Sequence, residues 1–424
     1  MSEKIKIMTI SDMPFAPSGV GTQTRYIIEG MLKTGKYKFI SLGGAMKHPN
    51  HDPIKTEEWG DDWITFPVDG YGSQEIVRSI IRQERPDILY FMTDPRFWGW
   101  LWEMENEIRP LLPMIYYHVW DNYPYPTYNK KFYESNDFVA TISKVTDDIV
   151  KTVAPSVNSM YVPHAVDTDI FKKQDKDQVT EFIKNSFGER YDPDANKFIF
   201  FWNNRNARRK QSGSLIFWFK EFLDKVGHDK ASLIMHTDIK DSHGQDLEKI
   251  INHLELTNGE VLFSQQKISP DLLSLLYNAA DCTINISDAE GFGLSTLESL
   301  SCETPILVNM TGGLQEQVTD GENWFGVGLK PASKAIIGSQ DIPWIQEDRL
   351  SGGKVVEAML KIYNMSEEER SELGQAGRNH VVANYNFEDF IQKWDEIFTT
   401  IYSEYGSWDT RKPYDGRWEL KEIV

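Results

Sequence analysis

Residues 283–298 read Thr283-Ile284-Asn285-Ile286-Ser287-Asp288-Ala289-Glu290-Gly291-Phe292-Gly293-Leu294-Ser295-Thr296-Leu297-Glu298. An apolar, strand-like run is followed by a glycine-rich turn and then by a segment that opens a helix. Glycines let the backbone approach a ligand closely, and the first amides of a helix are unpaired donors that suit a pyrophosphate. Glu290 stands where it can reach a sugar hydroxyl, and Glu298 can accept two hydrogen bonds from a ribose diol. An ordinary turn before a solvated helix face is the alternative interpretation.

The same alternation of short apolar runs and helical segments extends along most of the chain. Turn residues bound the runs, which is typical of parallel strands in an α/β sheet. The alternation lapses in the polar segment 172–197 and then starts again. Ligands bind outside the carboxyl ends of parallel strands. Two such sheets that face each other would therefore share one cleft. We predict strands at 5–10, 63–68, 88–92, 114–117, 138–141 and 160–162, then at 198–202, 233–236, 261–263, 282–286 and 305–308, with helices at 21–32, 214–226 and 271–280.

The composition excludes several classes of protein. The chain has 424 residues, enough for two or three domains, each with its own core. Its 45 basic and 64 acidic residues give a formal net charge of −19, which argues against a protein that coats nucleic acid or anionic membrane. Two cysteines exclude a disulfide scaffold and a cysteine-built zinc site. We expect neither a signal peptide nor an integral membrane segment, and therefore a cytoplasmic protein.

A basic run follows the predicted strand 198–202 directly: Asn203-Asn204-Arg205-Asn206-Ala207-Arg208-Arg209-Lys210. Four cations at the carboxyl end of a strand are unusual in so acidic a chain. Arginine grips phosphate oxygens with two hydrogen bonds and lysine acts as a point charge, so the run suits a diphosphate. A solvated basic loop or a contact for a polyanion is the alternative.

Two further features are weaker. Pro17-Ser18-Gly19-Val20-Gly21 is a short glycine turn between the first strand and the first helix. It lacks the third glycine of G-x-G-x-x-G, so a tight structural turn fits it as well as a phosphate loop. His118 ends a strand-like run, a place where a histidine is more often structural than catalytic. The acidic and histidine residues of 236–243 do not have metal-ligand spacing, and we predict no metal site.

Taken together, these motifs resemble the family 4 glycosyltransferases, which have the GT-B fold of two Rossmann-like domains facing each other across a cleft. The resemblance extends to about Phe398 and is strongest between Val261 and Gly326. Glu290 and Glu298 match the family's two glutamates separated by seven residues. The other matching segments are Tyr277 to Asp281, Thr304 to Val308 with Gly312 to Glu316, Arg205 with Lys210, Gly19 to Gly21, His118 with Asp121, and Val162 to Phe171.

The resemblance implies a retaining, metal-independent hexosyl- or pentosyltransferase whose donor is a UDP- or GDP-linked sugar, with no separate cofactor. It implies that Arg205 and Lys210 neutralise the leaving diphosphate, and that Glu298 holds the ribose. Glu290 then orients the donor hydroxyls, and His118 holds the donor sugar. The remaining candidates are Gly19, Val20, Gly21, Gly291, Phe292, Gly293 and Leu294 for the donor, and Asp94, Trp120 and Asp121 on the acceptor side.

The resemblance also implies a domain organisation. We predict an N-terminal acceptor-side domain over 1–194, a nucleotide-sugar domain over 195–386, and a helical segment over 387–424 that crosses back to the first domain. Two separate sheets would need to close over the substrates to exclude water.

Some positions depart from the family pattern and leave the substrates open. Ala165, Asn204 and Glu303 each replace a usual glycine, and Asp121 does not follow His118 directly. The basic run resembles that of virus- and phage-encoded members, for which the location would be the host cytoplasm. The acceptor candidates are a glycan, a small molecule, a protein or a hydroxymethylated DNA base. A catalytically inactive nucleotide- or carbohydrate-binding protein is one alternative, and an NAD-dependent oxidoreductase is another.

Overall fold

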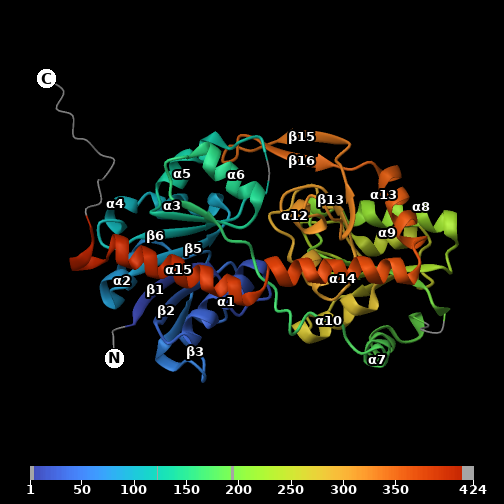
Figure 1. The fold of residues 1–424 in the computed structure, drawn as a ribbon, viewed down its shortest axis with the longest axis horizontal. Coiled ribbons are helices and arrows are strands. Elements are labelled where there is room, and N and C mark those ends of the chain that lie inside the picture. Colours follow the sequence, from blue (N-terminus) through green and yellow to red (C-terminus); the bar gives the residue numbers. More distant parts are fainter. Residues whose placement is uncertain (1–3, 122, 192–194, 413–424) are drawn as a thin grey trace.

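The computed structural model describes residues 4–121, 123–191 and 195–412. Two α/β domains lie side by side, each built on its own sheet with helices on both faces (Figure 1). The predicted fold class is therefore confirmed. Within the described residues, the longest and most apolar helices fall short of what a membrane crossing requires.

The first domain contains an eight-stranded sheet in the order β3-β4-β2-β1-β5-β6-β7-β8. All neighbouring strands are parallel except β3 and β4. Its strands are β1 (Ile5–Asp12), β2 (Tyr37–Gly44), β3 (Ile54–Lys55), β4 (Trp63–Pro67), β5 (Ile88–Thr93), β6 (Met114–His118), β7 (Phe138–Thr141) and β8 (Ser159–Tyr161). Its helices are α1 (Gly19–Lys33), α2 (Gln74–Glu84), α3 (Gly99–Trp102), α4 (Glu105–Ile108), α5 (Lys130–Glu134) and α6 (Lys144–Val153). The six predicted strands are confirmed, whereas β2 and β3 were not predicted.

The second domain contains an all-parallel sheet in the order β11-β10-β9-β12-β13-β14. Its strands are β9 (Phe198–Asn203), β10 (Ala231–His236), β11 (Val261–Ser264), β12 (Cys282–Asn285), β13 (Ile306–Asn309) and β14 (Gly326–Leu329). Its helices are α8 (Ser212–Val226), α9 (Leu247–His253), α10 (Pro270–Ala279), α11 (Leu294–Ser301), α12 (Leu314–Val318), α13 (Gly352–Tyr363) and α14 (Glu367–Asn384). Five of the six strands match the prediction, and β14 is the addition.

A helix before the predicted domain limit belongs to the packing of the second domain. Helix α7 (Lys176–Phe187) lies against α10, far from the first sheet (Figure 1). Its apolar positions Val179, Ile183 and Phe187 are buried. The limit at residue 194 between the two domains stays a prediction.

A β-hairpin links the two domains above the cleft. Strands β15 (Ser333–Ile337) and β16 (Ile345–Arg349) pair antiparallel and run from the second domain toward the first (Figure 1). Between them, Ile342 is buried in the core cluster of the first domain. The Tyr128 hydroxyl donates to the carbonyl of Trp344 at 2.7 Å, and their rings meet edge to face at 4.9 Å. The sequence analysis did not predict this hairpin.

The chain returns to the first domain through helix α15 (Phe387–Tyr405), which packs against α1. Trp394 and Phe398 on α15 are fully buried, and the Trp394 ring meets that of Tyr90 edge to face at 5.4 Å. The two helices approach so closely that a Cβ on Gly30 would lie 2.0 Å from the Ile391 side chain. A larger residue at this position would require the Ile391 side chain to shift.

Candidate active site

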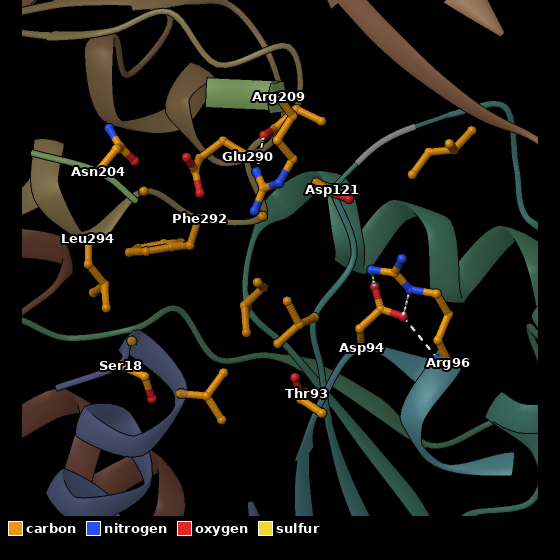
Figure 2. A pocket seen from close by; sticks show the side chains of 18 of the residues that line it. Ser18, Thr93, Asp94, Arg96, Asp121, Asn204, Arg209, Glu290, Phe292 and Leu294 are labelled. Atoms are coloured by element: carbon orange, nitrogen blue, oxygen red, sulfur yellow. Dashed lines mark hydrogen bonds and ion pairs between the residues drawn. The ribbon is translucent and has the colours of Figure 1, made fainter. Parts of the chain in front are cut away.

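A cleft of about 720 Å³ lies between the two sheets and under the hairpin. Its walls come from the carboxyl ends of β1, β5 and β6 in the first domain and of β9 and β12 in the second, which is where parallel sheets bind ligands. The close-up in Figure 2 shows the side chains of both walls pointing toward one another. The sequence prediction of one shared cleft is thus matched by the position of the cavity.

Glu290 and Lys210 form a buried ion pair at the second-domain wall. The Lys210 ammonium donates to Oε2 of Glu290, and Asn285 and Ser287 lie 3.4 Å from the same oxygen. Burial lowers the pKa of Lys210 to about 8. Burial alone would raise the pKa of Glu290, but Lys210 and Arg209 outweigh it and hold that pKa below its usual value. The site therefore holds a cation and a carboxylate in fixed positions before any ligand arrives.

The loop that carries Glu290 rests on a pair of glycines from another segment. The Gly313 amide donates to the Glu290 carbonyl at 3.1 Å. Gly312 has a φ of +48°, and a Cβ there would lie 1.8 Å from the same carbonyl oxygen. A side chain at this position would push the loop out of place, so Gly312 fixes the position of Glu290.

Arg209, rather than Arg205, faces the cleft. Arg205 donates its Nε to Asp241 at 2.6 Å and contacts His243, with 62% of its side chain exposed. Arg209 lines the cleft and donates Nη1 to the carbonyl of Ala289. Figure 2 shows its guanidinium between Glu290 and Asp121. The structure thus places Arg209 on the cleft, with Lys210 buried behind Glu290, and leaves Arg205 outside the cleft, because Asp241 holds Arg205 there.

Helix α11 presents its N-terminus to the same wall. Gly293 is its N-cap with a left-handed φ of +94°, and no side chain of the described residues caps it. Gly291, Phe292, Gly293, Leu294 and Ser295 all line the cleft. The unpaired first amides of the helix and its positive dipole end are therefore open to an anion.

Glu298 lies behind this wall rather than on it. Its Oε2 accepts from the Tyr277 hydroxyl at 2.7 Å, and Tyr277 accepts from the Asn203 side chain at 2.8 Å. Burial raises the pKa of Glu298 to about 7. Asn203 lines the cleft while Glu298 itself is not among the lining residues. The predicted ribose contact of Glu298 stays a prediction.

The glycine turn of the first domain is held by Asp12, which the sequence analysis missed. Gly19 and Val20 line the cleft, whereas Gly21 is buried and donates its amide to Ser18. The Ser18 hydroxyl donates to one oxygen of Asp12 at 2.6 Å, and Tyr71 donates to the other at 2.8 Å. The position of Asp12, as the last residue of β1, was the available signal, since strand ends face the site.

His118 and Trp120 do not reach the cleft. His118 is fully buried, with Nδ1 3.0 Å from the Tyr116 hydroxyl and Nε2 2.9 Å from the Tyr133 hydroxyl. Burial lowers its pKa to about 3, so the ring is neutral at physiological pH. Trp120 is also buried, whereas Val119 between them lines the cleft, as the alternation of an extended chain requires.

Among the described residues, His164 is the histidine that lines the cleft. Its Nδ1 lies 2.8 Å from the Tyr117 hydroxyl, and its ring meets Phe292 edge to face at 5.0 Å. Burial lowers its pKa to about 3. It therefore joins the two walls as a neutral group.

Asp94 and Asp121, the remaining acceptor-side candidates, both line the cleft. Arg96 donates to the two oxygens of Asp94, each at 2.9 Å (Figure 2). Thr93 precedes Asp94 with a φ of +148°, a conformation that costs a non-glycine residue on the order of 1–3 kcal/mol. The hydrogen bond from Tyr116 to the Thr93 carbonyl, at 2.7 Å, holds this turn in place. Burial raises the pKa of Asp121 above its usual value.

Comparison with known proteins identifies the second domain. Residues 189–337 match the family model "Glycosyl transferases group 1". This is a group 1 glycosyl transferase domain. Lys210, Arg209, Glu290 and Glu298 all lie within the matched residues, whereas Asp94, Trp120 and Asp121, the acceptor-side candidates, lie outside them. The predicted resemblance to family 4 glycosyltransferases is confirmed by the matches taken together.

Curated relatives match parts of this chain. The chain is 36% identical over 113 residues to a D-inositol 3-phosphate glycosyltransferase of Acidothermus cellulolyticus, covering 24% of this chain and 25% of the relative. It is 29% identical over 190 residues to the enzyme of the same name from Corynebacterium jeikeium, covering 44% and 43%. The chain thus matches less than half the length of each of these relatives.

Solved structures extend the likeness to both domains. Sucrose-phosphate synthase from Thermosynechococcus elongatus superposes with a TM-score of 0.75 at 16% identity, covering 95% of this chain and all of that one. Anabaena HepE in complex with UDP-glucose superposes with a TM-score of 0.65 at 14% identity, covering 93% of this chain and 99% of that one. The group 1 glycosyl transferase domain and the domain before it therefore share the GT-B fold.

The described titratable side chains do not form a metal-binding group. Among residues 4–121, 123–191 and 195–412, no three or more His, Cys, Asp or Glu residues are grouped so that they could hold a metal ion. The predicted lack of a metal site and of a cofactor stays a prediction.

Proposed function

We propose that this protein transfers a sugar from a nucleoside diphosphate sugar to a hydroxyl acceptor, with retention at the anomeric carbon. The observation that carries the proposal is one wall of the cleft, lined by Arg209, Glu290 and the N-terminus of α11, with Lys210 buried behind Glu290 and paired with it. The family match of the second domain supports it. Anabaena HepE, which shares the fold, was solved with UDP-glucose, and this supports a donor of that class.

The charges of this wall fit the chemistry of the leaving group. When the bond between the anomeric carbon and the phosphate oxygen breaks, negative charge grows on the nucleoside diphosphate. Arg209, Lys210 and the first amides of α11 would stabilise that charge without moving, which is electrostatic preorganisation. In this proposal the cations supply the compensation that a divalent metal supplies elsewhere, so the reaction needs no metal or further cofactor.

The donor sugar would lie over the Glu290 loop. Glu290 is ionised, because Lys210 and Arg209 keep its pKa low, and an ionised carboxylate accepts hydrogen bonds from sugar hydroxyls. Glu298 would accept from the ribose, with Tyr277 orienting it. His164, not His118, is the histidine with access to the donor.

Transfer then proceeds on one face of the sugar. The bond to the phosphate oxygen breaks, the acceptor oxygen bonds to the anomeric carbon from the same side, and the acceptor proton passes to the departing phosphate oxygen. The first-domain wall would hold the acceptor. The curated relatives are named for an inositol phosphate acceptor, which makes small polyols the first acceptors to assay.

A panel of UDP-, GDP- and ADP-sugars tests the proposal. We expect release of nucleoside diphosphate from one donor class, an unchanged rate with EDTA, and a product whose anomeric configuration by NMR matches the donor. Tight nucleotide binding by calorimetry without donor cleavage would instead support the inactive binding protein. Binding of NAD alone would support the oxidoreductase, which the family match disfavours.

A further inference from the structure

The two walls of the cleft carry different charge. Among the described lining residues, the first-domain wall carries the carboxylates of Asp12, Asp94 and Asp121 and one guanidinium, that of Arg96. We call these three carboxylates the acidic wall. Arg208 and Arg209 belong to the opposite wall, from which Arg209 approaches Asp121 (Figure 2). His164 adds no charge, since burial lowers its pKa to about 3. A phosphate or a nucleic acid placed against this wall would meet like charge, which opposes its binding most strongly where water is excluded.

The one cation of this wall is already occupied. Arg96 donates Nε and Nη2 to the two oxygens of Asp94, each at 2.9 Å, a bidentate pair. Its backbone amide also donates to Asp94 at 2.9 Å. Since Arg96 has the same fork geometry for a carboxylate as for a phosphate, an incoming phosphate would have to displace Asp94.

The same wall suits neutral hydroxyl groups. Ionised carboxylates are acceptors only, and each oxygen has more than one lone pair. Asp12 uses one hydrogen bond per oxygen, from Ser18 and Tyr71, so both oxygens can accept another. A polyhydroxyl compound supplies the donors that these oxygens lack, without bringing a charge of its own.

An aromatic ring completes the surface. Phe97 lines the cleft with 46% of its surface exposed, although large apolar side chains of this sheet are mostly buried. Its ring is backed by that of Tyr71 at 5.4 Å, the same Tyr71 that holds Asp12. An exposed, supported ring beside a few directed polar groups is the usual composition of a site for an organic ligand with one apolar face. A pyranose has such a face, formed by its C–H groups.

We propose that the acceptor is an uncharged saccharide. Its hydroxyls bind the acidic wall, its apolar face lies on Phe97, and the wall excludes phosphorylated sugars and DNA. This inference rests on the proposed function. It selects among the acceptors that the sequence left open, and it disfavours the hydroxymethylated DNA base.

The test compares neutral saccharides with phosphorylated sugars and with DNA as acceptors. Purified full-length protein, with the donor identified above, is given methyl glucoside, methyl galactoside, methyl mannoside and maltose. Parallel reactions receive glucose, galactose and mannose 6-phosphates and a duplex that contains hydroxymethylcytosine. Glycoside products are measured by mass spectrometry. We expect products with a neutral saccharide, with a kcat/KM insensitive to salt and higher than for any phosphorylated acceptor or DNA.

Two variants make the test independent of the acceptor's identity. Asp94→Ala frees Arg96, and we expect the ratio of kcat/KM for a sugar phosphate to that for its neutral counterpart to rise by about tenfold or more. Asp229→Ala is the matched control. It frees Lys230 from an exposed ion pair of 2.8 Å outside the cleft and leaves the ratio unchanged. If Asp94→Ala fails to fold, Phe97→Ala replaces it, with a rise in KM for the saccharide that exceeds any rise for the donor.

The outcomes separate the two proposals. A wild-type preference for sugar phosphates or DNA overturns the inference, and so does donor cleavage with none of the neutral saccharides glycosylated. An Asp94→Ala ratio equal to that of the wild type overturns it as well. Absence of donor cleavage in every reaction identifies a failure of the proposed function itself, and it overturns both.

Discussion

The turn after β1 and the turn after β9 occupy the same place in their two sheets, but their residues differ in charge. β1 lies between β2 and β5, and β9 lies between β10 and β12, so both turns open at the middle of a sheet edge. Residues 13–18 contain no charged side chain, whereas residues 204–211 contain four cations. The fold sets where a site lies, and the residues of the turn decide what it binds.

The two turns are also held in different ways. The first depends on one carboxylate, Asp12, which accepts from Ser18 and Tyr71. In the second, three cations pair with acids from other segments: Arg205 with Asp241, Arg208 with Glu347, and Lys210 with Glu290. The second turn therefore presents a positive charge that is fixed by its surroundings, which is the condition for preorganised catalysis.

The largest expected effect comes from removing the cations of the second turn. We expect Lys210→Gln and Arg209→Ala each to lower kcat for donor cleavage by about 10²–10³, and the double variant to lose less than the product of the two. Arg205→Ala is the matched control within the same turn, because Arg205 lies outside the cleft, and its kcat should stay near the wild-type value.

Steady-state kinetics measures the difference in kcat between these variants and Arg205→Ala. Thermal unfolding of each variant checks that it is folded. A loss of kcat in Arg205→Ala equal to that in Arg209→Ala would instead support the assignment made from the sequence. It would mean that Arg205 leaves Asp241 when the donor binds.

Glu298 gives the next largest effect, on nucleotide affinity. Lost hydrogen bonds to a charged acceptor cost about 1.5–3 kcal/mol, so Glu298→Gln should weaken binding of the nucleoside diphosphate by about 10- to 100-fold. The pKa of Glu298 is about 7, and only the ionised form accepts from both ribose hydroxyls. Wild-type affinity should therefore rise between pH 6 and pH 8.

Calorimetry of the wild type and of Glu298→Gln at both pH values tests this prediction. An affinity that is equal in wild type and Glu298→Gln at pH 8 would remove Glu298 from the site.

The protonation of Lys210 predicts a pH dependence of kcat/KM for the donor, with an effect smaller than that of Glu298 on nucleotide affinity. Its pKa is about 8, and a lysine is a cation below its pKa and neutral above it. The kcat/KM for the donor, which reports the free enzyme, should fall as the pH rises above about 8. Lys210→Arg keeps its charge at every accessible pH, so this variant should lose this fall in kcat/KM. A fall that persists unchanged in Lys210→Arg would assign it to another group.

The smallest effect concerns the hairpin that bridges the two walls. Trp344→Ala removes the edge-to-face contact with Tyr128 at 4.9 Å and loosens the link between the domains. We expect a few-fold rise in donor KM and a wider scattering envelope that contracts less on addition of nucleotide. Trp324→Ala, an exposed tryptophan away from the cleft, is the control. Identical scattering profiles for wild type with and without nucleotide would contradict domain closure.

The parts of the site that lie in one continuous segment could be predicted from the sequence. The strand, the Glu290 loop and the start of α11 occupy 17 consecutive residues, 282–298, and their chemistry is local. The direction of Arg205 and Arg209 was not predictable in this way, because it depends on Asp241 and on the Ala289 carbonyl, both distant in sequence. His118 was misplaced for a related reason: its partners Tyr116 and Tyr133 close around it only in the folded sheet.

Two different causes explain the strands that the sequence analysis missed. β15 and β16 are mostly exposed or half-buried, so they lack the apolar run that marks a core strand. β2 is almost fully buried, but Lys38 and the terminal glycines Gly43 and Gly44 interrupt its apolar pattern. Hydrophobic patterning therefore misses exposed strands, and it also misses a buried strand whose apolar run is interrupted.

The return of α15 to the first domain affects how the chain matures during synthesis. Domains usually fold in order as they leave the ribosome. Here the first sheet lacks the cover that Trp394 and Phe398 provide until residues 387–405 have been made, after the whole second domain. The rings of Tyr90 and Tyr117, which contact Trp394 in the finished protein, stay uncovered in the nascent chain through that interval. The N-terminal domain is thus the first to be translated and the last to be completed, and a ribosome stalled near residue 386 would display an apolar surface for chaperones to bind.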